Sequence, residues 1–385
     1  MKKPVLFMAL IIIISIWANA AKNSVEVHFR VFSGANFVEG LSIDDIQLFE
    51  DGKPQTIDAL YLVKNKEILS MQGLEKKPKV KRLFVFVFYL RQYPPRLDEV
   101  IDYLFNQIIV SGDALTFLTP EKTYNLRGPA LHLKPKEEIA HQMKGLLRRD
   151  ITMGNSSYLK RLNQLKEILA DLSDESGSNI IQDMGIGLMK YKDTLGSIEK
   201  MRVKEQSRII NFLGQQKSKK EKKFAFIFYE REVKPDFNAS VMQRFQQQFN
   251  DRIDVLNDLQ GLFDIYRRKV VFDLKKIENR FPGLNLVVNF VNYKGMGFAP
   301  ARGVVMREYS EDALELFTKL VQLSGGMNQN SANLVAFFNT AQSYSSQFYT
   351  LQYVSSSPGK KKNKLTKIEI KIKDKNYKVY HRQGY

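Results

Sequence analysis

The chain has 385 residues, of which 44% are apolar, so it can bury one large core or two ordinary ones. It contains no cysteine, which excludes disulfide bonds, thiolate zinc sites, lipoprotein attachment and a cysteine nucleophile. The formal net charge of +18 is unevenly distributed, because residues 360 to 385 hold ten Lys or Arg against two acids.

Residues 1–20 have the three parts of a secretory signal peptide. Lys2 and Lys3 precede an apolar run from Val5 to Trp17, and Ala18-Asn19-Ala20 resembles a cleavage site. An uncleaved membrane anchor is the alternative, but the run is shorter than the ~20 residues that span a bilayer. We therefore expect an exported protein, either periplasmic or extracellular.

Residues 21–64 are predicted to form the first part of a small β domain. Alternating apolar residues from Val25 to Val31 indicate a half-buried strand whose His28 faces outward. Asp51-Gly52 predicts a hairpin turn, with Ile57, Leu60 and Leu62 in the returning strand. Residues 65–80, which include a Lys-Lys-Pro-Lys run, are interpreted as a linker.

The acidic residues near this turn suggest a calcium-binding loop as one interpretation. They lack the alternating oxygen ligands and the closing glutamate of such a loop, so turn-forming acids are the preferred interpretation. The residues concerned are Asp44, Asp45, Glu50 and Asp51.

The stretch from Lys81 to Tyr93 predicts the central strand of a parallel sheet. Its unbroken Val- and Phe-rich run is typical of a strand that is covered on both faces. Pro94-Pro95 then opens an amphipathic helix to Ile108, with Pro95 at its first position. Ligands bind at the carboxyl ends of such strands, so a site is expected at residues 89–93.

The next elements alternate between strand and helix. A strand at 113–118 is followed by a short helix at 135–147, a helix at 155–172 behind Ser caps, and a helical region to about Leu213. Gly185-Ile186-Gly187 is only a fragment of a nucleotide-binding pattern. The strand Phe224 to Tyr229 has the same form as the central strand, so the two are expected side by side, with Arg91 near Glu230.

A helix from about 239 to 274, a strand at 284–291, and helices at 310–323 and 332–340 complete this region. The predicted fold class is α/β, with a doubly wound, mostly parallel sheet. Residues 81–345 form this domain, which contains a helical insertion at about 150–215.

Residues 346–385 are predicted to complete the small, β-sandwich-like domain. Ile368, Ile370 and Ile372 alternate with charged residues, and a turn leads to Tyr377–Tyr380, which predicts a terminal hairpin. The isoleucines are expected to pack on the N-terminal strands. The basic face of this hairpin is a solvated surface or a site for an anionic partner, and it contains Lys367, Lys371, Lys373 and Lys378.

Several motifs resemble the bacterial, acidobacterial-type von Willebrand factor A-related proteins. These are residues 40–46, Glu50-Asp51-Gly52-Lys53-Pro54-Gln55, Ser324-Gly325-Gly326, residues 349–353, and residues 367–372 with 380–385. The resemblance covers the expected mature chain in the family's order. It implies an exported protein with a β unit before an A domain.

The chain departs from the A-domain pattern at the metal-ion-dependent adhesion site. Tyr89-Leu90-Arg91-Gln92-Tyr93 replaces Asp-x-Ser-x-Ser, and Tyr229-Glu230-Arg231 stands where a second Asp would follow a later strand. A guanidinium repels a hard cation, so we expect no metal and no cofactor. Arg91 is predicted to fill the vacated position and pair with Glu230; alternatively, Arg91 and Arg231 extend into solvent.

The sequence favours a non-catalytic protein. Its four histidines, His28, His132, His141 and His381, lack metal or triad spacing, and no nucleophile elbow or phosphate loop is present. Glu230 with Glu232 or Asp236 could form a hydrolytic carboxylate pair, but surface turn acids are preferred.

The predicted function is an exported protein-interaction or adhesion module with an unknown protein partner in the cell envelope or outside the cell. Alternatives are metal-dependent ligand binding at a non-standard site, and binding of anionic envelope polymer through the basic face. Nucleic acid is not an expected partner, and a membrane is one only through an uncleaved signal segment. The candidate interaction loops contain Tyr89, Arg91, Tyr93, Tyr229, Glu230 and Arg231.

Overall fold

The computed structural model describes most of the chain between residues 24 and 384. The predicted signal segment, His132 and residues 267–274 of the helix expected to reach residue 274 lie outside the described residues. Within 24–384 the residues not described are 35, 74–77, 79, 132, 175–179, 217–220, 267–274, 276–283, 285, 296, 298, 300, 357–365 and 374–375.

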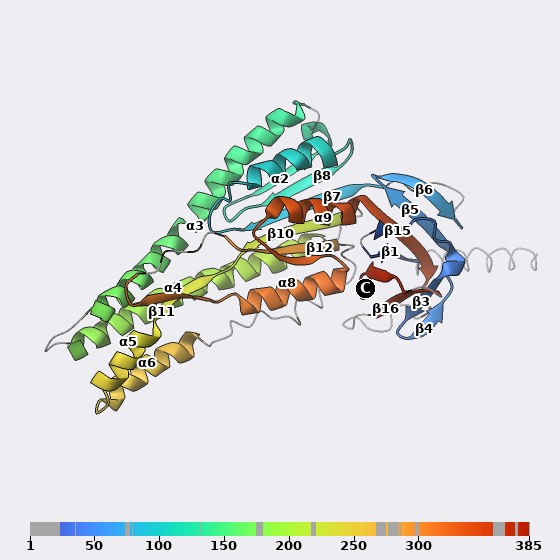
Figure 1. Cartoon of the computed structure of the whole chain (residues 1–385). Coiled ribbons are helices and arrows are strands. Elements are labelled where there is room, and N and C mark those ends of the chain that lie inside the picture. The colour runs from blue at the N-terminus through green and yellow to red at the C-terminus, as the bar shows by residue number, and fades with distance from the viewer. Residues whose placement is uncertain are drawn as a thin grey trace, which may run out of the picture.

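A six-stranded sheet lies at the centre of the molecule (Figure 1). Its order is β14-β12-β10-β7-β8-β9, and all neighbours are parallel except β8 and β9. Strand order therefore reverses between β7 and β10, as in doubly wound folds. The strands are β7 (Arg82–Tyr89), β8 (Ala114–Leu118), β9 (Thr123–Arg127), β10 (Lys222–Glu230), β12 (Leu286–Tyr293) and β14 (Asn328–Ser331).

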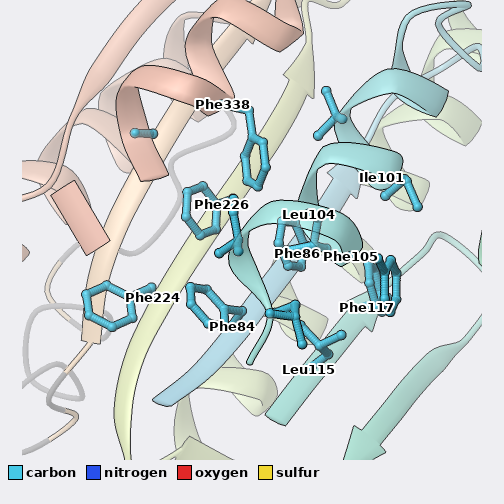
Figure 2. Packing of buried hydrophobic residues seen from close by; sticks show 14 of the residues in the cluster. Phe84, Phe86, Ile101, Leu104, Phe105, Leu115, Phe117, Phe224, Phe226 and Phe338 are labelled. Carbon is cyan, nitrogen blue, oxygen red and sulfur yellow. The ribbon is translucent and has the colours of Figure 1, made fainter. Parts of the chain in front are cut away.

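The central apolar runs form strands because both faces of the sheet are covered by helices. Phe86 stacks on Phe117 and Phe226, with ring centroids 5.1 and 5.2 Å apart, in the core shown in Figure 2. Helices α2 (Leu97–Tyr103), α3 (Lys136–Asp174) and α9 (Leu334–Ser346) cover this face, whereas α4 (Ile180–Gln216) and α8 (Glu311–Ser324) cover the other. The structure thus confirms a mixed α/β fold with a mostly parallel sheet.

Several predicted helix boundaries are wrong. Pro95 precedes α2, which begins at Leu97 after a turn closed by the Leu97 N–H and the Pro94 carbonyl, 3.0 Å apart. The two helices predicted at 135–147 and 155–172 are one, α3. Gly154, between the two predicted helices, lies inside α3, and a Cβ there would approach Pro120 Cβ to 2.5 Å, so the glycine allows close packing at this point.

The helix predicted from residue 239 is also divided. Asn238 caps α5 (Ala239–Gln248) by accepting a hydrogen bond from the Val241 N–H at 2.9 Å. A second helix, α6 (Ile253–Tyr266), follows after a short break.

The outer halves of α3 and α4 project from the sheet as an arm (Figure 1). The arm has its own apolar core, because α5, α6 and the two-stranded ribbon of β11 (Val233–Phe237) and β13 (Val304–Glu308) pack on these helices. The arm therefore contains α5, α6, β11 and β13 in addition to the helical insertion that the sequence predicted. Although α3 and α4 are long, no helix within the described ranges is suited to cross a bilayer.

Strands from both ends of the chain form a β unit beside the central sheet. One sheet has the order β17-β1-β15-β5-β6, with β2 on β1, and the other is β16-β3-β4. Ile368, Ile370 and Ile372 pack on Val27 and Phe29 between them, as expected from the sequence. The strands are β1 (Ser24–Ser33), β2 (Asn36–Phe37), β3 (Ile46–Glu50), β4 (Lys53–Gln55), β5 (Ala59–Lys64), β6 (Glu67–Gln72), β15 (Gln347–Val354), β16 (Ile368–Ile372) and β17 (Lys378–His381).

The pairing inside the β unit corrects three predictions. The strand that returns from Asp51-Gly52 is β4, whereas β5 pairs with β15 and β6 in the other sheet. Strand β6 occupies part of the predicted linker at 65–80. Strands β16 and β17 do not form a hairpin, because β16 pairs with β3 and β17 pairs with β1.

His28 does not face solvent as predicted, because the outer face of its sheet packs against the α/β region. Its Nδ1 shares a 2.9 Å hydrogen bond with Oγ1 of Thr350, and its ring meets the Phe348 ring edge-on at 5.5 Å. Phe348 in turn packs on Phe224 at the start of β10, with centroids 5.9 Å apart. The alternating pattern predicted that one face of β1 is buried. The opposite face, which carries His28, is also covered.

Gly325 and Gly326 allow two close approaches at the end of α8. Gly325 ends α8 with a positive φ of 70°, and a Cβ there would lie 2.4 Å from the carbonyl carbon of His381 in β17. A Cβ on Gly326 would lie 1.8 Å from the carbonyl oxygen of Val288 in β12. Gly325 is therefore required where the β unit meets α8, and Gly326 where the segment after α8 meets the central sheet.

Candidate functional site

The candidate site lies where β7 and β10 end side by side. Tyr89 at the end of β7 pairs with Tyr229 in β10, so the segments that follow both strands leave the same edge of the sheet. This is the point at which strand order reverses, where open α/β sheets form a crevice between diverging loops. We call it the carboxyl edge.

Glu230 holds the segment after β7 in place. Its Oε2 accepts hydrogen bonds from the backbone N–H groups of Arg91 and Gln92, at 2.7 and 3.1 Å. The residue is 4% exposed, and burial raises the pKa of its carboxyl although these hydrogen bonds oppose the shift. Arg91 lies beside Glu230 as predicted, but the predicted pair between its guanidinium and Glu230 is wrong, because the contact is made by the Arg91 backbone N–H.

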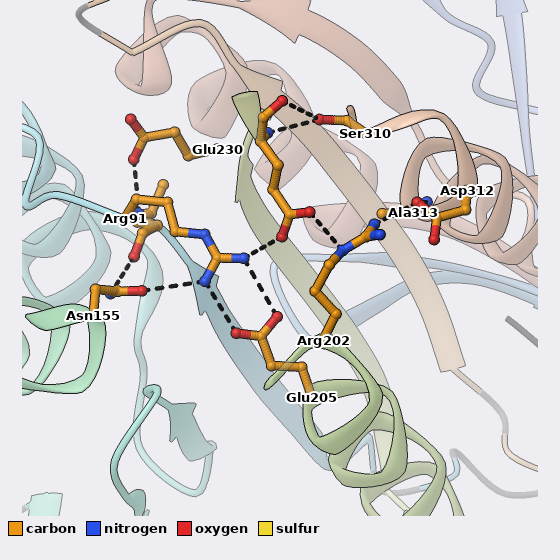
Figure 3. A network of polar contacts seen from close by, with 10 residues as sticks. Arg91, Asn155, Arg202, Glu205, Glu230, Ser310, Asp312 and Ala313 are labelled. Atoms are coloured by element: carbon orange, nitrogen blue, oxygen red, sulfur yellow. Dashed lines mark hydrogen bonds and ion pairs between the residues drawn. The ribbon is translucent and has the colours of Figure 1, made fainter. Parts of the chain in front are cut away.

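The Arg91 guanidinium pairs with other carboxylates (Figure 3). Its Nη1 lies 3.0 Å from Glu205 Oε1 and 3.3 Å from Asn155 Oδ1, while Nη2 contacts Glu232 Oε1. The guanidinium also stacks 4.2 Å from the centroid of the Tyr158 ring. Burial alone lowers the pKa of Arg91, but Glu205 and Glu232 outweigh it and hold the pKa well above the usual value.

A second buried arginine, Arg202, extends the network. Its Nε lies 2.6 Å from Glu232 Oε2, and its Nη2 lies 2.5 Å from Asp312 Oδ1. Glu232 therefore lies between two guanidinium groups. Its backbone N–H also donates to Ser310 Oγ at 2.7 Å, which fixes the segment after β10 against the start of α8.

The charged groups of the network come from four parts of the fold. Arg91 follows β7, Glu232 follows β10, and Asp312 lies in the first turn of α8. Arg202 and Glu205 are three residues apart in α4, so they share one face of that helix. The network thus ties two strand ends to two helices across the sheet edge.

The carboxylates near Glu230 are not the surface turn acids predicted from the sequence. Glu232 and Asp236 are 3% and 9% exposed, and Asp236 pairs with Arg307 at 2.5 Å. Within the described parts of the chain, no group of three or more His, Asp or Glu could hold a metal ion.

Some predicted interaction residues are buried. Arg91 is 5% exposed and Tyr229 lies between Phe290 and Phe317, with ring centroids 6.2 and 5.7 Å away. Burial raises the pKa of the Tyr229 hydroxyl, which keeps it neutral. These two side chains support the edge and do not form a contact surface, so that part of the prediction is wrong.

The other predicted residues lie nearer the surface. Tyr89 is partly buried against Phe317, with centroids 5.9 Å apart. The Tyr93 hydroxyl donates to Asp98 Oδ1 at 2.5 Å, and Arg148 covers its ring. Arg231 is about one third exposed and faces Glu308 at 3.7 Å.

Sequence reasoning missed Asn155, Arg202, Glu205 and Asp312. Asn155 Nδ2 donates to the carbonyl oxygens of Leu90 and Ile151, each at 2.7 Å, which joins α3 to the β7 end. Arg202 and Glu205 lie in a charged stretch that resembles any solvated helix face. Only the positions of α3 and α4 over the edge distinguish these residues.

A small pocket opens beside Glu230, with a volume of about 240 Å³. It lies between the segment after β10, the start of β11, the loop after β12, and β13. A Cβ on Gly295 would lie 2.4 Å from Glu230 Oε1, so a side chain at this position would occupy the space beside that oxygen. The pocket is lined by Glu230, Arg231, Val233, Gly295, Gly297, Met306 and Glu308.

The predicted basic face is divided between the two sheets of the β unit. Lys371 and Lys373 are exposed at β16, and Lys371 pairs with Glu369 at 2.9 Å. Lys378 is exposed on β17 with its Nζ 5.2 Å from the Tyr380 ring centroid. Lys367 is also exposed, and its backbone forms an isolated bridge with Gly384.

The chain matches no protein-family profile, no curated protein and no solved structure.

Proposed function

We propose that the chain is an exported, non-catalytic protein-interaction or adhesion module. In this proposal its central domain is a von Willebrand factor A-like scaffold whose metal site is lost. A protein partner in the cell envelope or outside the cell binds at the carboxyl edge, next to the loops that follow β7 and β10.

The position of Arg91 is the observation that carries this proposal. The first residues after the central strand, at the reversal of strand order, are where this scaffold would present a metal to its partner. Here a buried guanidinium occupies that place and binds Glu205 and Glu232. A divalent ion would have to displace this charge from carboxylates that already have partners.

The geometry favours binding over catalysis. Glu232 is shared by two arginines, and Glu230 accepts two backbone hydrogen bonds at one oxygen. A general base must lie within hydrogen-bond reach of the substrate proton that it removes. Glu232 is enclosed by its protein partners, so it does not present an oxygen to a substrate. The network instead rigidifies the edge, as a preorganised binding surface requires.

Capture from envelope extract with the purified protein as bait tests this function. The bait is used as wild type, as Glu308→Lys at the carboxyl edge, and as Lys378→Glu on the β unit, in buffer with and without a chelator. Each variant reverses one exposed charge, so Lys378→Glu is the control for Glu308→Lys. We expect a partner that is retained with the chelator and by Lys378→Glu, and is lost with Glu308→Lys.

Each other outcome contradicts the proposal. Retention that is lost with Lys378→Glu and falls steeply with salt indicates anionic polymer on the β unit. Retention that needs millimolar Mg²⁺, Ca²⁺ or Mn²⁺, together with a rise in melting temperature on adding the ion, indicates a metal-dependent site. Retention that is equal for all baits places the contact away from the edge.

A further inference from the structure

We propose that the pocket beside Glu230 binds the cationic side chain of a lysine or arginine from the partner. This inference rests on the proposed function and adds the chemistry of recognition to it. The edge would then select a positively charged residue.

The first observation is the geometry of Glu230. Oε2 is fully used by the Arg91 and Gln92 N–H groups, whereas no described residue donates a hydrogen bond to Oε1. Figure 3 shows this second oxygen pointing away from Arg91 and its network. A carboxylate oxygen on a 4% exposed residue is thus held rigidly and remains available in the pocket.

The second observation is the charge around the pocket. Its lining contains two glutamates and one arginine, so the charge of the lining is −1 (−2 + 1) when all three are ionised. Arg231 and Glu308 lie on the exposed rim, 3.7 Å apart, where an ion pair is weak and easily exchanged. An incoming cation can therefore use both carboxylates, whereas an anion would meet Glu230.

The third observation is the size and composition of the pocket. A volume of about 240 Å³ is below the about 300–1,000 Å³ of most small-molecule pockets. It suits one side chain. Val233 and Met306 provide apolar surface for an alkyl stem while the charged head reaches Glu230.

Two nitrogen nuclei report directly on this site. The amides of Arg91 and Gln92 donate to the same carboxylate that the cation would bind, so their ¹H–¹⁵N resonances must shift when Glu230 gains a new partner. The probes are n-butylammonium and n-butylguanidinium, with n-butyrate and n-butanol as charge-reversed and neutral controls. All are titrated into the full-length purified protein at constant ionic strength.

Two variants distinguish loss of the Glu230 charge from unfolding of the protein. Glu230→Gln keeps an acceptor oxygen for the two N–H groups, and Glu99→Gln removes an exposed carboxylate elsewhere. We expect saturable shifts with either cation in the wild type and in Glu99→Gln. Binding should weaken at least about tenfold in Glu230→Gln, as for the loss of one charged hydrogen bond.

The proposed cation site is contradicted if butyrate or butanol shifts the resonances of these two amides as strongly as the cations do, or if no probe shifts them. Competition completes the test: n-butylammonium should release a partner whose capture is lost with Glu308→Lys. If such a partner is captured but neither the cation nor Glu230→Gln affects it, the edge binds by another contact. The proposed function then stands while this inference fails.

Discussion

The two ends of strands β7 and β10 both bury positive charge, but they use it differently. At the amino ends, Arg82 forms a bidentate pair with Asp113, with Nε and Nη2 at 3.1 and 2.7 Å from its oxygens. Lys222 beside it bonds Thr350 Oγ1 at 3.0 Å and Tyr61 at 3.3 Å. At the carboxyl ends, Arg91 and Glu230 organise two loops around a pocket.

The difference shows what each end of the sheet does. The partners of Lys222 belong to the β unit, so its buried charge specifies how two parts of one chain dock. The partners of Arg91 come from α3, α4 and the segment after β10, which frame an open edge. The same strands therefore end in an internal interface on one side and, in our proposal, an external one on the other.

The largest expected effect is from replacing Arg91, which would show whether the carboxyl edge depends on its buried charge. Arg91→Met leaves Glu205 and Glu232 without their shared cation. We expect a loss of about 3–5 kcal/mol in the free energy of unfolding, measured by urea denaturation followed by circular dichroism. Adding Glu205→Gln should recover part of this loss.

Arg96 provides the matched control for Arg91. It also contacts a glutamate through two nitrogens, at 3.0 Å each, but it and Glu99 are exposed. Arg96→Met should leave the unfolding curve nearly unchanged, because solvent screens exposed pairs. Equal effects of the two substitutions would contradict the structural role of the Arg91 network.

The next effect concerns the junction of the β unit. Gly325→Ala places a methyl group against the His381 carbonyl carbon at a positive φ, and we expect about 1–3 kcal/mol of destabilisation. Gly185→Ala is the control, since a Cβ there meets nothing within 4 Å and alanine favours a helix. If both variants raise the melting temperature, the close contact at the junction is wrong.

A pH-dependent effect separates the two ends of the sheet. Burial lowers the pKa of Lys222 from 10.5 to about 8, although Glu26 opposes this. Between these two values the unfolded chain binds more protons than the folded one, so the contribution of Lys222 to stability increases with pH. The stability of wild type relative to Lys222→Met should therefore rise from pH 8 to 10.5, whereas the Arg91→Met difference should stay constant.

The smallest expected effect is at Glu230. Burial raises the pKa of its carboxyl, so its contribution to stability is present at low pH and is lost as the pH rises through the folded-state pKa. The groups facing Glu230 are Arg91, Arg231 and Tyr293. Glu230→Gln should gain stability relative to wild type between pH 4 and pH 7, and a relative loss over this range would contradict the burial of the charge.

The sequence predicted the parts of the fold that local pattern determines. Unbroken apolar runs identified β7, β10 and the later core strand, and their shared form predicted that β7 and β10 are neighbours. Alternation also indicated that the isoleucines of β16 would pack on β1. In each case the burial of side chains determines the pattern. It gives an unbroken apolar run where both faces of a strand are covered, and alternation where one face is covered.

The remaining features depend on contacts between distant segments. The guanidinium of Arg91 has its partners at Glu205 and Glu232, more than a hundred residues away in sequence, and nothing near them distinguishes buried from solvated charge. Strand β9 and the separation of β16 from β17 follow from sheet pairing that short motifs do not specify.

Anomalous diffraction from crystals soaked in millimolar Mn²⁺ tests the central claim most directly. Our account predicts no anomalous peak between residues 89–93 and 229–232, with Arg91 still bound to Glu205 and Glu232. A manganese peak there, with the Arg91 side chain displaced from those carboxylates, would contradict the account.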